Sequence, residues 1–190
     1  MEENKKTIMI DMDEVLVCNN FTKLLEEFLG KVDFSKLTSN NRQDLIKGRE
    51  EEFKEKFKYE NLYKNNNEYI EPIKDSVRVI KKLNEKYNIY IVTSYIWKNE
   101  IIDSSNNLKN KFEYLQKFFP FLNINNFIFI QDKTKLEFDI GIDDRINNLK
   151  NCKTKLLFNE LRNEKISKEE LKKLNTKRVL NWNEVEKELL

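Results

Sequence analysis

TIMIDMDEVLV, residues 7–17, carries the strongest structural signal in this sequence. An apolar run at 8–10 leads into two carboxylates, Asp11 and Asp13, and a second apolar run follows at 15–17. An ionised carboxylate is costly to bury. We therefore expect a buried strand to end at Asp11, so that both acids lie at the mouth of a sheet and not within it.

Further short apolar runs predict the rest of that sheet. They are β-branched or aromatic, show no polar alternation, and occupy 89–93, 127–130, 138–142 and 154–158. Runs of this kind are typical of strands covered on both faces, as in parallel sheets. Apolar residues at helical spacing in 77–87 and 108–119 separate some of the strands. Two shorter helices are predicted near the end of the chain, one of them with the capping box Ser167–Glu170. The alternation indicates an open α/β sheet.

The interval between the first two predicted strands is too long for a single crossover. An amphipathic stripe at 21–29 and further apolar spacing at 45–57 predict helices in it. We therefore expect a core domain formed by 1–17 and 72–190, with a small helical cap at 18–71 inserted after the first strand.

Composition excludes several classes of protein. The 190 residues carry 36% charged side chains but a net charge of only +2, so stable nucleic-acid binding is not expected. The absence of histidine rules out histidine-based catalysis, and two distant cysteines, Cys18 and Cys152, cannot form a four-thiolate zinc site. No apolar stretch is long enough to span a membrane, and the polar start MEENKKT does not resemble a signal peptide. A cytoplasmic protein is expected.

Polar side chains follow the predicted strands where those strands end. They are Asp11 and Asp13, Thr93 and Ser94, Lys133, and Asp143 and Asp144. Ligands of open α/β sheets bind at the carboxyl ends of the strands. Several carboxylates at one edge repel each other unless a cation neutralises them, and Mg²⁺ prefers such oxygen ligands together with phosphate. One carboxylate could attack phosphorus, and another could exchange a proton with the leaving oxygen.

The motifs DMDEVL, VTS, DKTK and IDD, in this order and spacing, resemble the haloacid dehalogenase-like (HAD) phosphohydrolases. Within them the chain is similar to the 5'(3')-deoxyribonucleotidases of cytosolic type C and their bacterial relatives, over nearly its whole length. The resemblance implies a Rossmann-like three-layer α/β core with a parallel sheet and a small helical cap. It also implies a Mg²⁺-dependent phosphomonoesterase that acts on nucleoside monophosphates through an aspartyl-phosphate.

The resemblance assigns roles to individual residues. Asp11 is implied as nucleophile and metal ligand, and Asp13 as general acid-base with its backbone carbonyl on the metal. The others implied are Thr93, Ser94 and Lys133 on the phosphate, Asp143 on the metal and Asp144 as a supporting carboxylate. Lys135 competes with Lys133 for the phosphate, and Lys133 is preferred by its spacing from the acidic pair.

Three further residues are candidate substrate contacts. Phe21 and Trp97 could stack on a nucleobase, although Phe21 also fits the apolar stripe of its helix. Arg145 could pair with phosphate or with Asp144. The family often has glycine where this chain has Glu14, a difference that bears on substrate preference.

We expect a small phosphomonoester as substrate and no membrane association, and a homodimer is compatible with the sequence. Two alternatives stay open: a phosphatase for another small metabolite, and a catalytically idle HAD-like domain that binds nucleotide.

Overall fold

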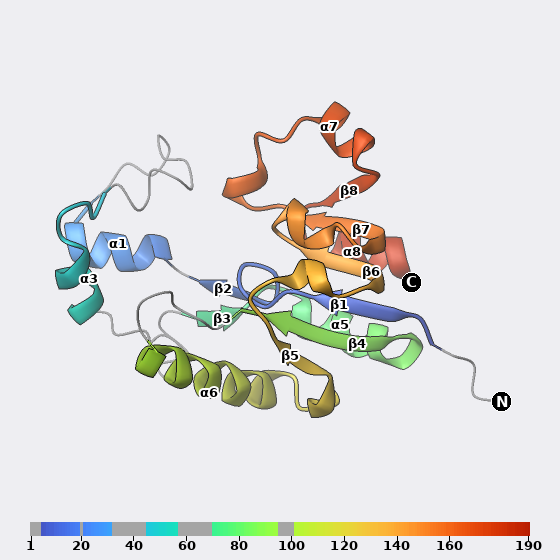
Figure 1. Cartoon of the computed structure of the whole chain (residues 1–190), viewed down its shortest axis with the longest axis horizontal. Helices are drawn as coiled ribbons and strands as arrows, with labels where there is room; N and C mark the ends of the chain where they lie inside the picture. Colours follow the sequence, from blue (N-terminus) through green and yellow to red (C-terminus); the bar gives the residue numbers. More distant parts are fainter. Residues whose placement is uncertain (1–4, 20, 32–44, 57–69, 95–100) are drawn as a thin grey trace.

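The computed structural model of the chain describes residues 5–19, 21–31, 45–56, 70–94 and 101–190. Its centre is a six-stranded parallel sheet with the order β5–β4–β1–β6–β7–β8 (Figure 1). The strands are β1 (Thr7–Ile10), β4 (Asn88–Thr93), β5 (Phe127–Phe129), β6 (Phe138–Asp143), β7 (Cys152–Phe158) and β8 (Thr176–Val179). The predicted α/β class with a parallel sheet is confirmed.

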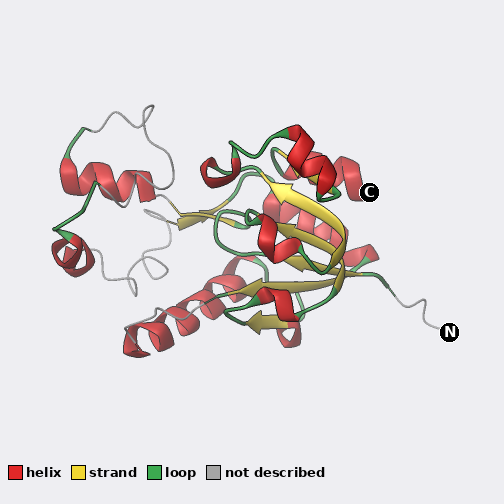
Figure 2. Cartoon of the chain, turned by 45° about the horizontal axis from the view of Figure 1, so that its top comes forward, coloured by secondary structure: helices red, strands yellow, loops and turns green. Residues whose placement is uncertain are grey.

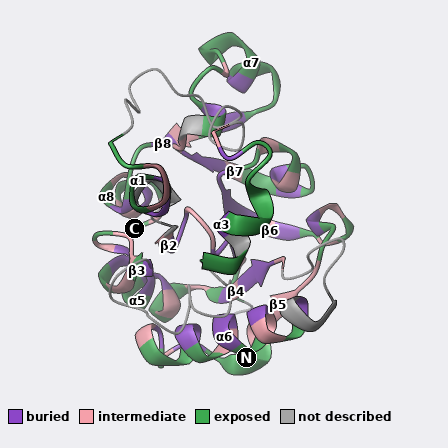
Figure 3. Cartoon of the chain, turned by 90° about the vertical axis from the view of Figure 1, so that its left-hand side faces the viewer, coloured by how far each residue is buried: buried purple, intermediate pink, exposed green. Residues whose placement is uncertain are grey.

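Strand β1 lies near the middle of the sheet because both of its faces are apolar. Ile8 and Ile10 belong to the larger hydrophobic cluster, whereas Met9 belongs to a second cluster on the opposite face. All three side chains are fully buried. Successive side chains of a strand point to opposite faces, so an unbroken apolar run requires cover on both sides. In Figure 3 the strands form the buried centre of the molecule.

Long helices supply the cover for the larger cluster. They are α5 (Ser76–Lys86), α6 (Ile101–Phe118) and α8 (Trp182–Leu189). Helix α5 contributes Val79, Ile80 and Leu83, at the spacing that the sequence predicts for a helix facing a core. Trp182 of α8 and Leu115 of α6 join the same cluster. These helices form one layer of the sandwich (Figure 2).

Shorter elements cover the other face. They are the 3₁₀ helices η3 (Lys133–Lys135) and η4 (Ile146–Leu149) and the helix α7 (Lys168–Lys173). Gly141 of β6 allows this layer to approach closely. A Cβ atom on it would lie 2.5 Å from Cys152 Sγ and 2.8 Å from Leu149 Cδ2, so a larger residue would force these side chains to shift.

The described part of 18–71 leaves the sheet on an antiparallel ribbon of β2 (Val17–Asn19) and β3 (Ile70–Pro72). Beyond the ribbon, α1 (Phe21–Leu29) packs on α3 (Glu50–Lys56), with the Phe28 and Phe53 rings 5.3 Å apart and nearly perpendicular. Figure 1 shows this helical unit at the far end of the ribbon from the sheet. The ribbon lies across both predicted borders of the cap, which itself stays a prediction.

Sequence patterns missed three strands. Strand β8, with the sequence TKRV, is the last strand of the sheet, and Lys177 and Arg178 keep contact with solvent. Edge strands often carry such charges, so β8 lacks the apolar run by which its neighbours were recognised. Strands β2 and β3 have three residues each, too few to show a period.

Candidate active site

The sheet order brings the predicted site residues together. Strands β4 and β6 both pair with β1, so Thr93 at the end of β4 and Asp143 at the end of β6 flank Asp11. The backbone N–H of Asp11 continues the ladder to the carbonyl of Ile142 at 2.9 Å. Asp11, Thr93 and Asp143 are all buried. The parallel strands therefore bring polar side chains from three distant segments of the chain to one edge of the sheet.

Lys133 connects two of these carboxylates. Its Nζ lies 2.6 Å from Asp11 Oδ1 and 2.8 Å from Asp143 Oδ2, and its side chain is buried. Burial opposes the charge on the ammonium, yet Asp11 and Asp143 raise the pKa of Lys133 above its usual range. The competitor Lys135 lies in the same short helix, but its side chain is 75% exposed and 3.9 Å from Asp132. The geometry therefore favours Lys133 over Lys135 as the candidate phosphate-binding lysine.

Asp143 is surrounded by protein donors. Its Oδ1 accepts from the backbone N–H of Arg145 at 2.8 Å and from Asn148 Nδ2 at 3.1 Å. Its Oδ2 accepts from Lys133 Nζ at 2.8 Å and from Asn148 Nδ2 at 3.0 Å. Both oxygens are occupied, so this carboxylate is suited to holding Lys133 in place.

Asp144 has a different environment. Arg162 Nε lies 2.8 Å from Asp144 Oδ2, an attraction without hydrogen-bond alignment. No donor from the described residues hydrogen-bonds to Oδ1. Burial, followed by repulsion from Asp11, raises the pKa of Asp144 to about 8, while Arg162 partly opposes the shift. Asp144 therefore keeps lone pairs for another ligand.

The three acids fit a hard divalent cation. One oxygen each from Asp11, Asp143 and Asp144 lies within 4.8 Å of the other two. Burial raises the pKa of Asp11 to about 6, although Lys133 lowers it, and Asp143 and Asp13 add repulsion. Carboxylates that repel each other in a buried cluster become favourable when a cation is bound between them. Among the described residues, Asp143 has both oxygens hydrogen-bonded, whereas Asp11 and Asp144 each keep an oxygen to which no donor hydrogen-bonds.

Lys111 of α6 is a site residue that sequence reasoning missed. Its Nζ donates to Asp13 Oδ2 at 2.5 Å, to Thr93 Oγ1 at 2.8 Å and to the carbonyl of Ser94 at 2.7 Å. The side chain is only 3% exposed, whereas that of Asp13 is 31% exposed. The available signal was a lysine four residues before Leu115, on the buried face of a helix. A lysine there needs an acidic partner.

A tight turn after β1 presents Asp13. The backbone N–H groups of Leu16 and Val17 donate to the carbonyl of Met12 at 2.9 and 3.1 Å. Buried Trp182 of α8 donates its indole N–H to the carbonyl of Val15 at 2.8 Å, so α8 anchors the turn.

Glu14 lies in this turn with a left-handed backbone, at φ 62°. Glycine adopts that conformation at no steric cost, whereas a residue with a Cβ is strained there. Burial, followed by repulsion from Glu160 and Asp13, raises the pKa of Glu14 to about 8. The position that the resemblance marks as frequently glycine thus has the backbone that glycine favours.

The segment after β7 supports Asp144. Asn163 donates to the carbonyl of Asp144 at 2.9 Å and to that of Phe158 at 2.8 Å. Arg178 of β8 donates to the side-chain oxygens of Asn159 and Asn163 and to the carbonyls of Asn163 and Ile166. The turn that carries Arg162 is therefore attached to the edge strand.

The remaining candidates are only partly placed. Phe21 begins α1, but its side chain and the whole of Trp97 lie outside the described residues. Arg145 is exposed, and its charge opposes a small part of the rise in the pKa of Asp144. Arg162, and not Arg145, makes the close ion pair with Asp144.

Comparison with known proteins agrees with this geometry. The family described as "5' nucleotidase, deoxy (Pyrimidine), cytosolic type C protein" matches residues 5–190. The chain belongs to this family. It is 31% identical over 197 residues to the 5'(3')-deoxyribonucleotidase of Bacillus subtilis (strain 168), covering 98% of this chain and 99% of that protein. The 5'(3')-deoxyribonucleotidase of Bacillus phage SPbeta matches with the same identity and coverage.

Solved structures agree on the fold. The HAD-hydrolase YfnB from Bacillus subtilis, bound to magnesium, superimposes with a TM-score of 0.57 at 14% identity, over 98% of this chain and 99% of that one. A haloacid dehalogenase-like family protein from Streptococcus pneumoniae gives a TM-score of 0.53 at 13% identity, with the same coverage. The predicted resemblance to HAD-like phosphohydrolases and their deoxyribonucleotidase branch is confirmed. This member of the nucleotidase family is a phosphoric monoester hydrolase.

In the described part of the chain, no helix combines the length and the apolar character needed to cross a membrane.

Proposed function

We propose that this nucleotidase hydrolyses (deoxy)ribonucleoside monophosphates with Mg²⁺, through an aspartyl-phosphate on Asp11. One observation carries the proposal. Buried Asp11 lies between Lys133, 2.6 Å away, and the carboxylate Asp144, whose oxygen lies within 4.8 Å of its own. A nucleophile for phosphorus needs this combination of a positive charge for the phosphoryl oxygens and a site for a cation.

In the first step, a carboxylate oxygen of Asp11 attacks phosphorus, and the bond from phosphorus to the ester oxygen breaks. Asp13 donates a proton to the leaving oxygen, so the nucleoside departs as an alcohol. Lys111 orients Asp13 by donating to its Oδ2 at 2.5 Å, and is itself held by Thr93 Oγ1 and the carbonyl of Ser94 at 2.8 and 2.7 Å. The phosphate is assigned to Thr93, Ser94 and Lys133, whose hydroxyl and ammonium groups would donate to its oxygens, with the positive charge of Lys111 nearby.

In the second step, water attacks the phosphorus of the aspartyl-phosphate. Asp13 accepts a proton from that water, the bond between phosphorus and the Asp11 oxygen breaks, and inorganic phosphate leaves. The enzyme returns to its starting state, with Asp13 protonated as before. The 31% exposure of the Asp13 side chain is compatible with contact to both the leaving group and water.

For the metal we propose Asp11 and Asp144 as side-chain ligands, with the carbonyl of Asp13 beside them. Bound there, Mg²⁺ would supply positive charge next to the transferring phosphoryl group. The sequence resemblance implies Asp143 as the metal ligand. In this proposal Asp143 would instead position Lys133 through their ion pair. Metal titrations separate the two assignments. Asp144→Asn should abolish Mg²⁺ binding, whereas Asp143→Asn should retain it and lose activity. The opposite pattern would restore Asp143 as the ligand.

The substrate class follows from the relatives, which are named as 5'(3')-deoxyribonucleotidases. Phosphate release should be measured from a panel of 5'- and 3'-nucleoside monophosphates, in ribo and deoxy forms, with Mg²⁺ and with EDTA. Sugar phosphates belong in the same panel. We expect metal-dependent turnover of nucleotides that Asp11→Asn abolishes.

Three results would contradict the proposal. A sugar phosphate turned over faster than every nucleotide would favour the general-phosphatase alternative. Nucleotide binding without phosphate release would favour the idle domain. Retained activity in Asp11→Asn would contradict an aspartyl-phosphate intermediate on Asp11.

A further inference from the structure

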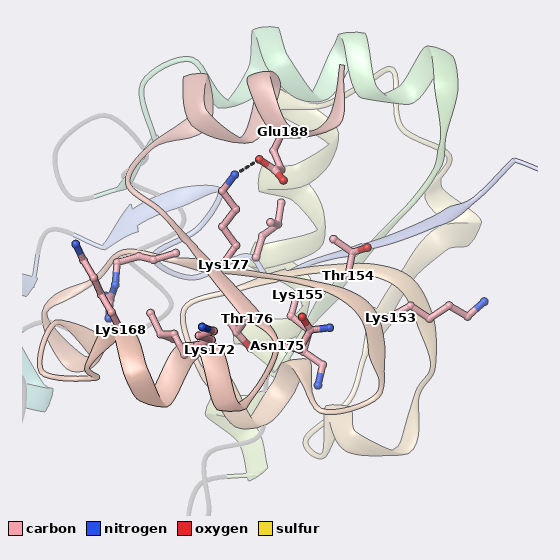
Figure 4. Close-up of a pocket in the computed structure, with 12 residues that line it drawn as sticks. Lys153, Thr154, Lys155, Lys168, Lys172, Asn175, Thr176, Lys177 and Glu188 are labelled. Atoms are coloured by element: carbon pink, nitrogen blue, oxygen red, sulfur yellow. Dashed lines mark hydrogen bonds and ion pairs between the residues drawn. The ribbon is translucent and has the colours of Figure 1, made fainter.

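A strongly basic, open pocket lies away from the site. It has a volume of about 540 Å³ and is lined by β7, the edge strand β8 and the helices α7 and α8 (Figure 4). Strand β6 separates β7 from β1, so the pocket is two strands removed from the strand that ends at Asp11. Its lining on β7 is the half formed by 153–156, before the carboxyl end where the active site begins.

Six of the twelve lining residues are cationic. Its charged residues are Lys153, Lys155, Lys168, Lys172, Lys177 and Arg178, with Glu188 as the single acid. The whole chain has a net charge of only +2, so this concentration is local. Like charges gathered at one concave surface repel each other and attract anions.

Three of the cations already have partners. Lys177 is ion-paired with Glu188, and Lys153 Nζ lies 2.8 Å from Asp139 Oδ1. Arg178 is held by the acceptors of the 159–166 segment at 2.5–3.0 Å. These groups maintain the walls of the pocket and are not counted as ligand-binding groups.

The side chains of Lys155, Lys168 and Lys172 have no hydrogen-bond or ion-pair partner among the described residues. Lys168 and Lys172 project from successive turns of α7, and Lys155 is half-buried in β7, next to Leu156 and Leu157. A half-buried ammonium in a sheet is costly without a counter-charge. Asn175 adds an amide to the same lining. These lysines therefore form a cationic surface that no acid in the described part of the chain neutralises.

We propose that this pocket binds an oligophosphate group through Lys155, Lys168 and Lys172. Three uncompensated ammonium groups match a compact ligand with several negative charges, and lysine is a common phosphate binder. The volume suits a small molecule and not a polynucleotide, which would need an extended basic surface. No aromatic residue is in the lining, so no nucleobase is stacked there. The ligand is thus recognised by its phosphates, whether it is inorganic or the tail of a nucleotide.

The test is calorimetric titration of the full chain with tripolyphosphate and, separately, with ATP, at low ionic strength and in EDTA. No inorganic phosphate is added, because it would compete for the pocket, and the pocket variants below separate binding at the pocket from binding at the active site. We expect both ligands to bind with similar affinity. The double variant Lys155→Gln/Lys172→Gln should weaken binding about a hundredfold, since each lysine lost removes a charge-assisted contact. Lys173→Gln, on the same helix but outside the lining, is the matched control and should bind as the wild type does.

In the double variant, phosphate release from a nucleoside monophosphate should be unchanged, and the midpoint of thermal unfolding should be no lower than in the wild type, which shows that the variant is folded. Binding of ATP without binding of tripolyphosphate would overturn the assignment, because the phosphates would not suffice. Equal affinity in the double variant and in Lys173→Gln would also overturn it. So would displacement of tripolyphosphate by chloride or sulfate at equal ionic strength, because the pocket would then not distinguish oligophosphate from other anions.

Discussion

Replacing Lys111 by methionine removes one positive charge while keeping a side chain of similar length in the core. In the wild type, Lys111 Nζ donates to Asp13 Oδ2, Thr93 Oγ1 and the carbonyl of Ser94. A buried acceptor left without its donor costs about 1–3 kcal/mol. Asp13 is 31% exposed, so water can replace the lysine there. The carbonyl of Ser94 keeps the Thr93 hydroxyl as a donor at 3.3 Å. We therefore expect Lys111→Met to lower the free energy of unfolding by about 2 kcal/mol, mostly at Thr93.

The catalytic effect should be larger than the stability effect. Loss of one preorganised electrostatic group beside a transferring phosphoryl group typically lowers kcat by about 100- to 1000-fold. If Lys111 also orients Asp13 as the acid, the loss should depend on the leaving group. Nucleoside esters need protonation on departure, whereas p-nitrophenyl phosphate does not. In Mg²⁺-dependent phosphate-release assays, Lys111→Met should therefore lose more activity on the nucleoside ester than on the p-nitrophenyl ester.

Lys109 provides the matched control on the same helix. Its side chain is 67% exposed, and its ammonium lies 3.9 Å from Glu113. Lys109→Met should leave both kcat/KM and urea unfolding within error of the wild type. The reasoning is refuted if Lys111→Met behaves like Lys109→Met. Equal losses on both leaving groups would refute the orientation of Asp13 by Lys111.

Three further predictions concern the surroundings of the site. Without metal, stability should fall as pH rises from about 4 to about 8, because the raised pKa values of Asp11 and Asp144 mean that each carboxyl favours the fold only while protonated. The increase in Tm on adding Mg²⁺ should therefore be larger at pH 8 than at pH 5, and equal increases in thermal unfolding would contradict this. Glu14→Gly should relieve the left-handed backbone and remove a repelled acid whose pKa is about 8, so its stability gain of about 1 kcal/mol in urea unfolding should be larger at pH 9 than at pH 6. Glu14→Gln should reproduce only the pH-dependent part of that gain. Arg178→Lys should weaken the hold on Asn163, which donates to the carbonyl of Asp144. Mg²⁺ binding should then be about tenfold weaker in a metal titration. Unchanged affinity would show that β8 does not influence the metal site.

Much of the fold and the site was predictable because short apolar runs mark where parallel strands end. Asp11, Thr93 and Asp143 directly follow or close such runs, so their common position at one edge could be inferred. The capping box at Ser167 was also predicted, and it is present in α7. These features depend on residues close together in the chain.

Lys111 and Arg178 could not be assigned in this way. Lys111 lies 98 residues from its partner Asp13 and in a helix whose period alone marks it as one more core position. Arg178 lies in a strand without an apolar run, and its acceptors belong to a turn at 159–166. Their roles depend on which segments pack against each other.

The sequence by itself determined the class of fold, the strand ends that carry the acids, and the membership in a nucleotidase family, because each of these is encoded in local runs and motifs. Only the tertiary structure decided how the charges are shared. It placed Lys133 between Asp11 and Asp143, left Asp144 with an oxygen for a cation, and brought Lys111 to Asp13. The physical reason is that a buried charge is stabilised by whichever opposite charge lies within a few ångströms, and that neighbour is selected by packing between distant segments.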